Sequence, residues 1–150
     1  MKKFLSRLLM GDPVQKVEVD APFDRVMEAL EQAVRQNGFG IQAVHDLKQT
    51  YARQKMDLDP GFRYSIVEIC EPAKSYKALT GLGYDMGVMM PKSIIVASEN
   101  GKTTLRYMRL KPWMVSMMFP DWDVAPLSRN VSATLEKITR DTLAACEEEA

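Results

Sequence analysis

Two side chains in this sequence could supply reactive groups: the thiol of Cys70 and the imidazole of His45. Cys70 stands where a predicted strand leads into a predicted helix. A helix N-terminus favours the nucleophilic thiolate, whereas the nearby carboxylates of Glu68 and Glu71 disfavour it. His45 is the only histidine, so a nucleophilic cysteine–histidine pair has to combine it with Cys70 or with Cys146.

Both candidates also have structural explanations. Unpaired cysteine behaves as a small apolar side chain and is among the most buried residue types. A histidine at a strand end commonly bonds to a neighbour, here Asp46. We therefore treat Cys70, His45, Lys92 and Glu68 as candidates for a thiol- or sulfur-handling enzyme or carrier. The sequence assigns a catalytic role to none of them and favours a protein that is not an enzyme.

The chain offers few metal or cofactor ligands. Two cysteines and one histidine, widely spaced, match no zinc motif. The carboxylates in the predicted loops lack the spacing of an EF-hand. We therefore expect no metal site. Covalent haem is excluded because Cys-x-x-Cys-His is absent, so a haem held by a methionine and His45 is the one cofactor that stays open.

Methionine is concentrated in the second half of the chain, where seven of the eleven methionines follow residue 85 and both tryptophans are interleaved with them. Methionine suits irregular cores and adaptable binding surfaces, and tryptophan is common at interfaces. Three interpretations stay open: core filling beneath the C-terminal helix, a self-association or partner surface, and the lining of an apolar ligand pocket or membrane-contact loop. The candidate contact residues are Met89, Met90, Trp113, Met114, Met117, Met118, Phe119 and Trp122.

The segment from Met1 to Met10 predicts an amphipathic helix with a basic face that includes Lys2 and Arg7. Arg7 interrupts the apolar part, so this is no signal peptide. A basic amphipathic helix can lie on an anionic membrane surface. Ten residues are few for a stable isolated helix, so the sequence favours a helix packed on its own domain or on a partner subunit.

Composition narrows the functional class. The 150 residues correspond to one domain, and 20 basic and 20 acidic side chains give zero net charge. A nucleic-acid-binding protein is usually basic, so no nucleic-acid partner is expected. Two cysteines without a signal peptide predict a reducing, cytoplasmic location, with peripheral membrane contact left open. No apolar run reaches the roughly 18 residues that a membrane span needs.

Hydrophobic periodicity predicts five strands, over residues 14–19, 39–45, 62–70, 93–98 and 103–108. Helices are predicted over residues 1–10, 20–37, 46–56, 72–81 and from 125 or 127 to 148. Asn100-Gly101 predicts a hairpin turn, and residues 111–126 show no clean period. Polarity alternates along the strands, which parallel sheets buried on both faces rarely show. The order (α)βαβαβαββα therefore predicts an α+β fold, mainly antiparallel, with helices on one face.

Several short motifs together resemble one family, the domain of unknown function 302, which comprises small bacterial and other prokaryotic proteins. The motifs lie between residues 14 and 110: Asn37-Gly38-Phe39, His45-Asp46-Leu47-Lys48, Ile69-Cys70-Glu71-Pro72-Ala73, Met90-Pro91 and residues 94–101. The resemblance implies a two-layer α+β sandwich similar to the TATA-binding-protein half-domain, and a homodimer. Family members often carry a cysteine after Met-Pro, where this chain has Lys92. A site with two thiols is therefore excluded here.

The sequence thus predicts a single domain over residues 1–150. It comprises an N-terminal amphipathic helix (1–12), a family-like core (14–110) and a Met/Trp-rich segment with the C-terminal helix (111–150). The predicted function is a small cytoplasmic binding or interaction module, homo-oligomeric, with an apolar Met/Trp-rich contact surface or a surface for a small apolar ligand. The alternatives are a thiol- or sulfur-handling protein using Cys70, and a peripheral membrane or haem-binding protein.

Overall fold

The computed structural model describes residues 1–148 and, within them, every side chain except that of Lys3. One antiparallel sheet forms the centre of the molecule, with the strand order β1-β5-β4-β3-β2. The strands are β1 (Val14–Val19), β2 (Gly40–Asp46), β3 (Tyr64–Cys70), β4 (Lys92–Glu99) and β5 (Lys102–Met108). The predicted α+β class with an antiparallel sheet is confirmed.

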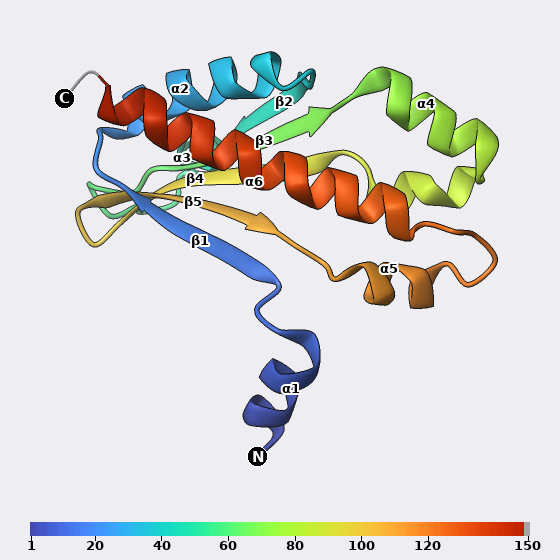
Figure 1. The fold of residues 1–150 in the computed structure, drawn as a ribbon. Helices are drawn as coiled ribbons and strands as arrows, with labels where there is room; N and C mark the ends of the chain where they lie inside the picture. The colour runs from blue at the N-terminus through green and yellow to red at the C-terminus, as the bar shows by residue number, and fades with distance from the viewer. Residues whose placement is uncertain (149–150) are drawn as a thin grey trace.

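Seven helices accompany the sheet in the described part of the chain (Figure 1). They are α1 (Lys2–Met10), α2 (Phe23–Gln36), α3 (Leu47–Arg53), α4 (Pro72–Gly81), the 3₁₀ helix η1 (Tyr84–Met89), α5 (Pro112–Met118) and α6 (Ala125–Glu147). Helices α2 and α6 pack side by side on one face of the sheet, as Figure 1 shows. Side chains alternate along each strand, so every second residue of β3 faces these helices and is buried.

The main core lies between this helix pair and the sheet. Leu30 of α2, Val67 of β3, Leu105 of β5 and Ile138 of α6 are completely buried there. A second, smaller core contains methionine, valine and aromatic side chains from η1, α5 and the start of α6. Its buried members are Met86, Val115 and Val124, with Phe119 and Trp122 among the side chains packed against them.

Local signals place most of the boundaries. Asn100 and Gly101 both have positive φ, 52° and 76°, and connect β4 to β5 as the predicted hairpin turn. The Asp46 carboxylate accepts a hydrogen bond from the backbone N–H of Gln49 at 3.2 Å and caps α3. The prediction that Asp20 begins α2 is wrong, because the helix starts at Phe23 with Pro22 in the N-cap position.

Helix α5 lies in the segment for which the sequence showed no period. It has seven residues, with a proline in its first turn, and Val115 is its one buried residue. A helix of two turns with one buried position has too few apolar repeats to produce a helical pattern.

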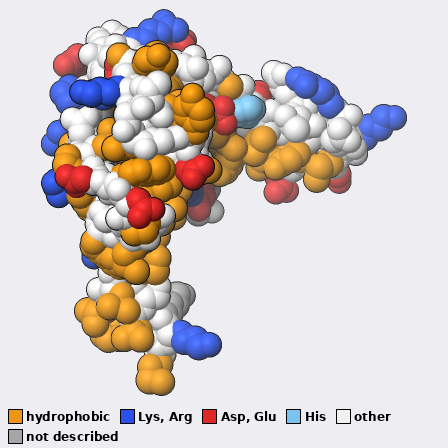
Figure 2. All heavy atoms as spheres, turned by 90° about the vertical axis from the view of Figure 1, so that its right-hand side faces the viewer, with side chains coloured by type: hydrophobic (Ala, Val, Ile, Leu, Met, Phe, Trp, Pro, Cys, Tyr) orange, Lys and Arg blue, Asp and Glu red, His pale blue; other side chains and the backbone are white. Residues whose placement is uncertain are grey.

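Helix α1 projects away from the rest of the molecule (Figure 1). Its apolar side chains are exposed, Phe4 by 74% and Leu8 by 68%. Figure 2 shows them as a hydrophobic group standing clear of the main body. Of the two expected packings, the one on its own domain is therefore wrong, and the one on a partner subunit stays a prediction.

Candidate functional site

A cavity of about 250 Å³ opens at the end of the sheet where β3 stops and β4 begins. Helices α4, α5 and α6 and the 3₁₀ helix η1 contribute its other walls. Most of the lining is apolar. The lining residues are Phe39, Ile69, Cys70, Glu71, Lys74, Ser75, Ala78, Met86, Val88, Met89, Met90, Pro91, Lys92, Ser93, Met108, Leu110, Val115, Val124, Leu127, Ser128, Val131, Ser132 and Leu135.

The turn after β3 explains why a space forms there. Cys70 ends the strand, and the carboxylate of Glu71 accepts a hydrogen bond from the backbone N–H of Lys74 at 2.8 Å, which caps α4. Pro72 occupies the first turn of α4 and fixes the helical backbone angle in advance. Helix α4 thus leaves the end of the sheet, and η1 leads the chain back to β4. The apolar face of α6 closes the space between them.

Lys92 is the notable charge on the cavity wall. It is the first residue of β4 and stands opposite Ile69 of β3, one residue before Cys70. Burial lowers the pKa of the Lys92 ammonium below its ordinary value. Among the described residues, no carboxylate lies within ion-pair distance of it. A partly desolvated cation without a counter-charge is electrostatically prepared to receive an anion.

Other polar side chains of the cavity form hydrogen bonds within the chain. The Lys74 ammonium donates to the side-chain oxygen of Asn130 at 3.2 Å, and Glu71 serves as the cap of α4. Ser75 donates its hydroxyl to the carbonyl of Pro72 at 3.0 Å. Among the described lining residues, Lys92 is the partly buried cation, whereas Lys74 is exposed and keeps its charge beside a neutral partner.

The structure does not bring Cys70 and His45 together. His45 pairs with Ile66, four residues before Cys70 along β3, a separation of roughly 13 Å at about 3.3 Å per residue. Its Nε2 instead lies 3.4 Å from Oε1 of Glu68. His45 does not line the cavity, so the structure also does not combine it with the cavity methionines in a haem site.

The predicted Met/Trp surface divides into three parts. Met89 and Met90 line the cavity. The rings of Phe119 and Trp122 stack with their centroids 5.6 Å apart in the second core. The third part is exposed and comprises Trp113, Met117 and Met118. Met114 is half-buried.

Several cavity residues were not predicted from the sequence. Leu127, Val131 and Leu135 are apolar at helical spacing and were expected only to pack as the face of the last helix. In the structure this stripe also forms one wall of the cavity. The stripe was visible in the sequence, but nothing in the sequence indicates that α4 and η1 leave a space above it.

The described residues hold neither a cluster of metal ligands nor a membrane-spanning helix. In residues 1–148, no group of three or more histidine, cysteine or acidic side chains is arranged to hold a metal ion. None of the helices described there is both long and apolar enough to cross a bilayer.

Comparison with known proteins agrees with this fold. A search of curated proteins found no match. Among solved structures, the chain is similar to an uncharacterised conserved DUF302 protein from Bacillus stearothermophilus. The two share 25% identity and a TM-score of 0.67, over 89% of this chain and 98% of the other. The model of the family described as domain of unknown function DUF302 matches residues 15–142. With most of its length and its fold accounted for in this way, the chain belongs to the DUF302 family.

Proposed function

We propose that this protein is a binding module for a small amphipathic anion. The apolar part of the ligand occupies the cavity and its anionic group pairs with Lys92. The observation that carries the proposal is the position of Lys92, a desolvated cation without an ion-pair partner among the described residues, on the wall of an otherwise apolar space. Ligand pockets generally combine apolar walls with a few polar groups that fix orientation.

The cavity volume limits the size of the ligand. Its roughly 250 Å³ lies just below the range of about 300–1,000 Å³ found for drug-sized ligands. At roughly 30 Å³ for a group the size of a water molecule, it accommodates about eight heavy atoms. The seven chain carbons of octanoate fit this space, with its carboxylate at the wall beside Lys92.

The methionines support adaptable binding. Met86, Met89, Met90 and Met108 all line the cavity. Their unbranched, polarisable side chains can repack around apolar chains of different shape. The proposal therefore concerns a class of ligand, an apolar chain with one anionic end.

A series of ligands with different head groups tests the proposal. Octanoate, octanol and octylamine share the chain and differ in charge, so titration calorimetry compares the head groups directly. A charge-assisted hydrogen bond contributes about 1.5–3 kcal/mol, so octanoate should bind about 10- to 150-fold more tightly than octanol. Lys92→Met keeps the apolar stem and should remove this preference.

Matched variants separate the cavity from general surface effects. Lys77→Met removes an exposed cation of α4 that does not line the cavity, and it should retain the octanoate preference. Ser132→Phe places a ring on the α6 wall and should weaken all three ligands. Equal binding of octanoate and octanol by the unmodified protein, or no saturable binding of either, would contradict the proposal.

One observation favours a second candidate, thiol chemistry at Cys70. The thiol and Lys92 line the same cavity on adjacent strands, so an anionic electrophile held by Lys92 would lie near sulfur. Iodoacetate and iodoacetamide test this arrangement, because both transfer a carbon group to the thiolate with loss of iodide and only the first is anionic. Iodoacetate should react with Cys70 faster in the unmodified protein than in Lys92→Met, with iodoacetamide little changed. Native protein in which Cys70 resists both reagents would exclude this candidate.

A further inference from the structure

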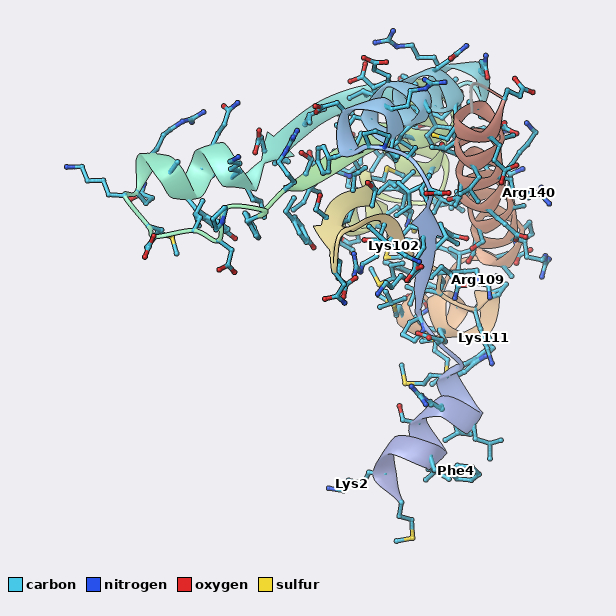
Figure 3. The ribbon with its side chains drawn as sticks, turned by 90° about the vertical axis from the view of Figure 1, so that its left-hand side faces the viewer. Lys2, Phe4, Lys102, Arg109, Lys111 and Arg140 are labelled. Atoms are coloured by element: carbon cyan, nitrogen blue, oxygen red, sulfur yellow. The ribbon has the colours of Figure 1, made fainter. Side chains whose placement is uncertain are left out.

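Helix α1 presents two contrasting faces to solvent. Met1, Phe4, Leu5, Leu8 and Leu9 lie on one side of the helix, since they recur at intervals of three and four residues. Lys2, Ser6 and Arg7 lie on the other. Figure 3 shows Phe4 and Lys2 pointing in opposite directions from α1. The apolar side is uncovered along its length, with Leu5 at 54% and Leu9 at 59% exposure.

The charges of the chain are distributed unevenly around this helix. Residues 1–11 contain three of the 20 basic side chains and none of the 20 acidic ones. The remainder of this neutral chain therefore carries net negative charge. The basic character of the molecule is concentrated beside its most exposed apolar helix.

Further basic residues stand at the base of α1. The backbone N–H of Arg109 donates to the carbonyl of Pro13 at 2.8 Å, which fixes the end of β5 beside the chain that leaves α1. The Lys111 side chain approaches Gly11 so closely that a β-carbon there would stand 3.2 Å from its Cε. In Figure 3, Lys111 and Arg109 lie between α1 and Arg140 of α6. Two acidic groups near these cations are Asp12, which accepts the backbone N–H of Val14, and Glu136, 4.0 Å from Arg109, and the exposed Asp121 and Asp123 follow α5.

Helix α5 adds a second apolar group at the same end of the molecule. In Figures 1 and 3, α5 lies at the edge of the body nearest α1. Trp113, Met117 and Met118 of α5 are exposed, Met117 by 73%. Tryptophan is favoured at membrane–water interfaces because its ring is apolar and its N–H is polar.

We propose that this end of the molecule, α1 together with the exposed face of α5, docks on the surface of an anionic lipid bilayer. The apolar side of α1 enters the boundary between headgroups and acyl chains, and Lys2, Arg7 and Lys111 meet the lipid phosphates. Pairing two α1 helices of two copies through their apolar sides would leave these cations in water, where their charge contributes nothing to the contact. An anionic bilayer satisfies both faces at once.

Binding to vesicles tests the docking. Flotation or sedimentation measures binding of the full chain to phosphatidylcholine vesicles and to vesicles that also contain about 30% phosphatidylserine. Each basic residue near an anionic surface contributes about fivefold in affinity, so three of them predict roughly 100-fold tighter binding to the anionic vesicles. Phe4→Glu and Leu8→Glu should each abolish vesicle binding. Arg7→Glu should remove most of the preference for anionic vesicles, and Met117→Glu should weaken vesicle binding.

The controls exclude unfolding and general hydrophobicity. Because α1 stands clear of the body, Phe4→Glu should leave the midpoint of thermal unfolding unchanged. Met56→Glu replaces another exposed apolar side chain, 54% exposed and remote in sequence from both helices, and should leave vesicle binding intact. Equal binding to neutral and anionic vesicles would overturn the proposal. A protein that binds neither kind of vesicle would also overturn it. If light scattering then shows an oligomer that Phe4→Glu dissociates, α1 is a subunit contact.

Discussion

Replacing Lys92 by methionine should make the ligand-free protein more stable at neutral pH. The folded state buries the ammonium, which lowers its pKa below the ordinary value, and among the described residues no carboxylate compensates. Methionine keeps the apolar stem in contact with the cavity wall and removes the charge. Functional residues often lower the stability of the fold, so a destabilising Lys92 agrees with a role in ligand binding.

The pH dependence of stability isolates the effect of this charge. The unfolded chain holds its proton on Lys92 up to the ordinary lysine pKa, whereas the folded chain releases it at lower pH. Between these two pKa values the unfolded state binds more protons, so the free energy of unfolding contributed by Lys92 rises with pH. Below the folded-state pKa both states hold the proton, so the destabilisation caused by burying the charge is present in full and no longer changes with pH. One proton gives a slope of at most about 1.4 kcal/mol per pH unit.

Urea denaturation at a series of pH values measures this contribution as the difference between the unmodified protein and Lys92→Met. The difference should favour Lys92→Met at neutral pH and diminish as the pH rises towards the ordinary lysine pKa. Lys77→Met, which removes an exposed cation, should show no such trend. A Lys92→Met variant that is less stable at pH 7 would refute the reasoning, because the ammonium would then be stabilised by the fold.

Three further substitutions test the packing and the hairpin turn of the fold. Gly83→Ala should destabilise the protein by about 1–3 kcal/mol, because the added β-carbon would stand 2.5 Å from Cζ2 of Trp122. Gly61→Ala is the control, since a β-carbon at Gly61 meets no atom within 4 Å. An unchanged unfolding midpoint for Gly83→Ala would contradict the position of the Trp122 ring. Leu30→Ala should cost about 2–5 kcal/mol because Leu30 is completely buried; a loss below about 1 kcal/mol in urea denaturation would place it outside the core. Gly101→Ala should cost roughly 1–2 kcal/mol because its φ is +76°; thermal unfolding that is unaffected would contradict the hairpin geometry.

Local sequence signals were sufficient for most of the fold. Alternation along Tyr64–Cys70 predicted a strand with one buried side, and the left-handed angles at Asn100 and Gly101 formed the predicted turn. Each of these features depends on residues adjacent in the chain. Helix α5 was missed because its packing is set by η1 and α6 rather than by its own period.

The candidate site could be predicted only in part. Cys70, Lys92, Met89 and Met90 were named from the sequence, and all four line the cavity. The cavity itself could not be predicted, because its walls come from elements that are distant in sequence and its volume depends on how far α4 diverges from α6. The same limit applies to His45, whose distance from Cys70 follows from the register of β2 against β3.

The homo-oligomer implied by the family resemblance stays a prediction. The exposed side chains Trp113, Met117 and Met118 suit either a subunit contact or the bilayer contact proposed above. Light scattering on the unmodified protein and on Met117→Glu distinguishes these roles. A subunit contact predicts a mass that falls to that of the monomer, whereas a bilayer contact predicts no change in mass.

The ionisation of Lys92 in the presence of a ligand tests the binding site most directly. Heteronuclear NMR of the lysine side chains follows the titration of Lys92 with and without octanoate, and Lys92→Met assigns the signal. A carboxylate paired with the ammonium stabilises its charged form, so the pKa of Lys92 should rise when octanoate binds. A Lys92 titration that is the same with and without saturating octanoate would contradict the proposed site.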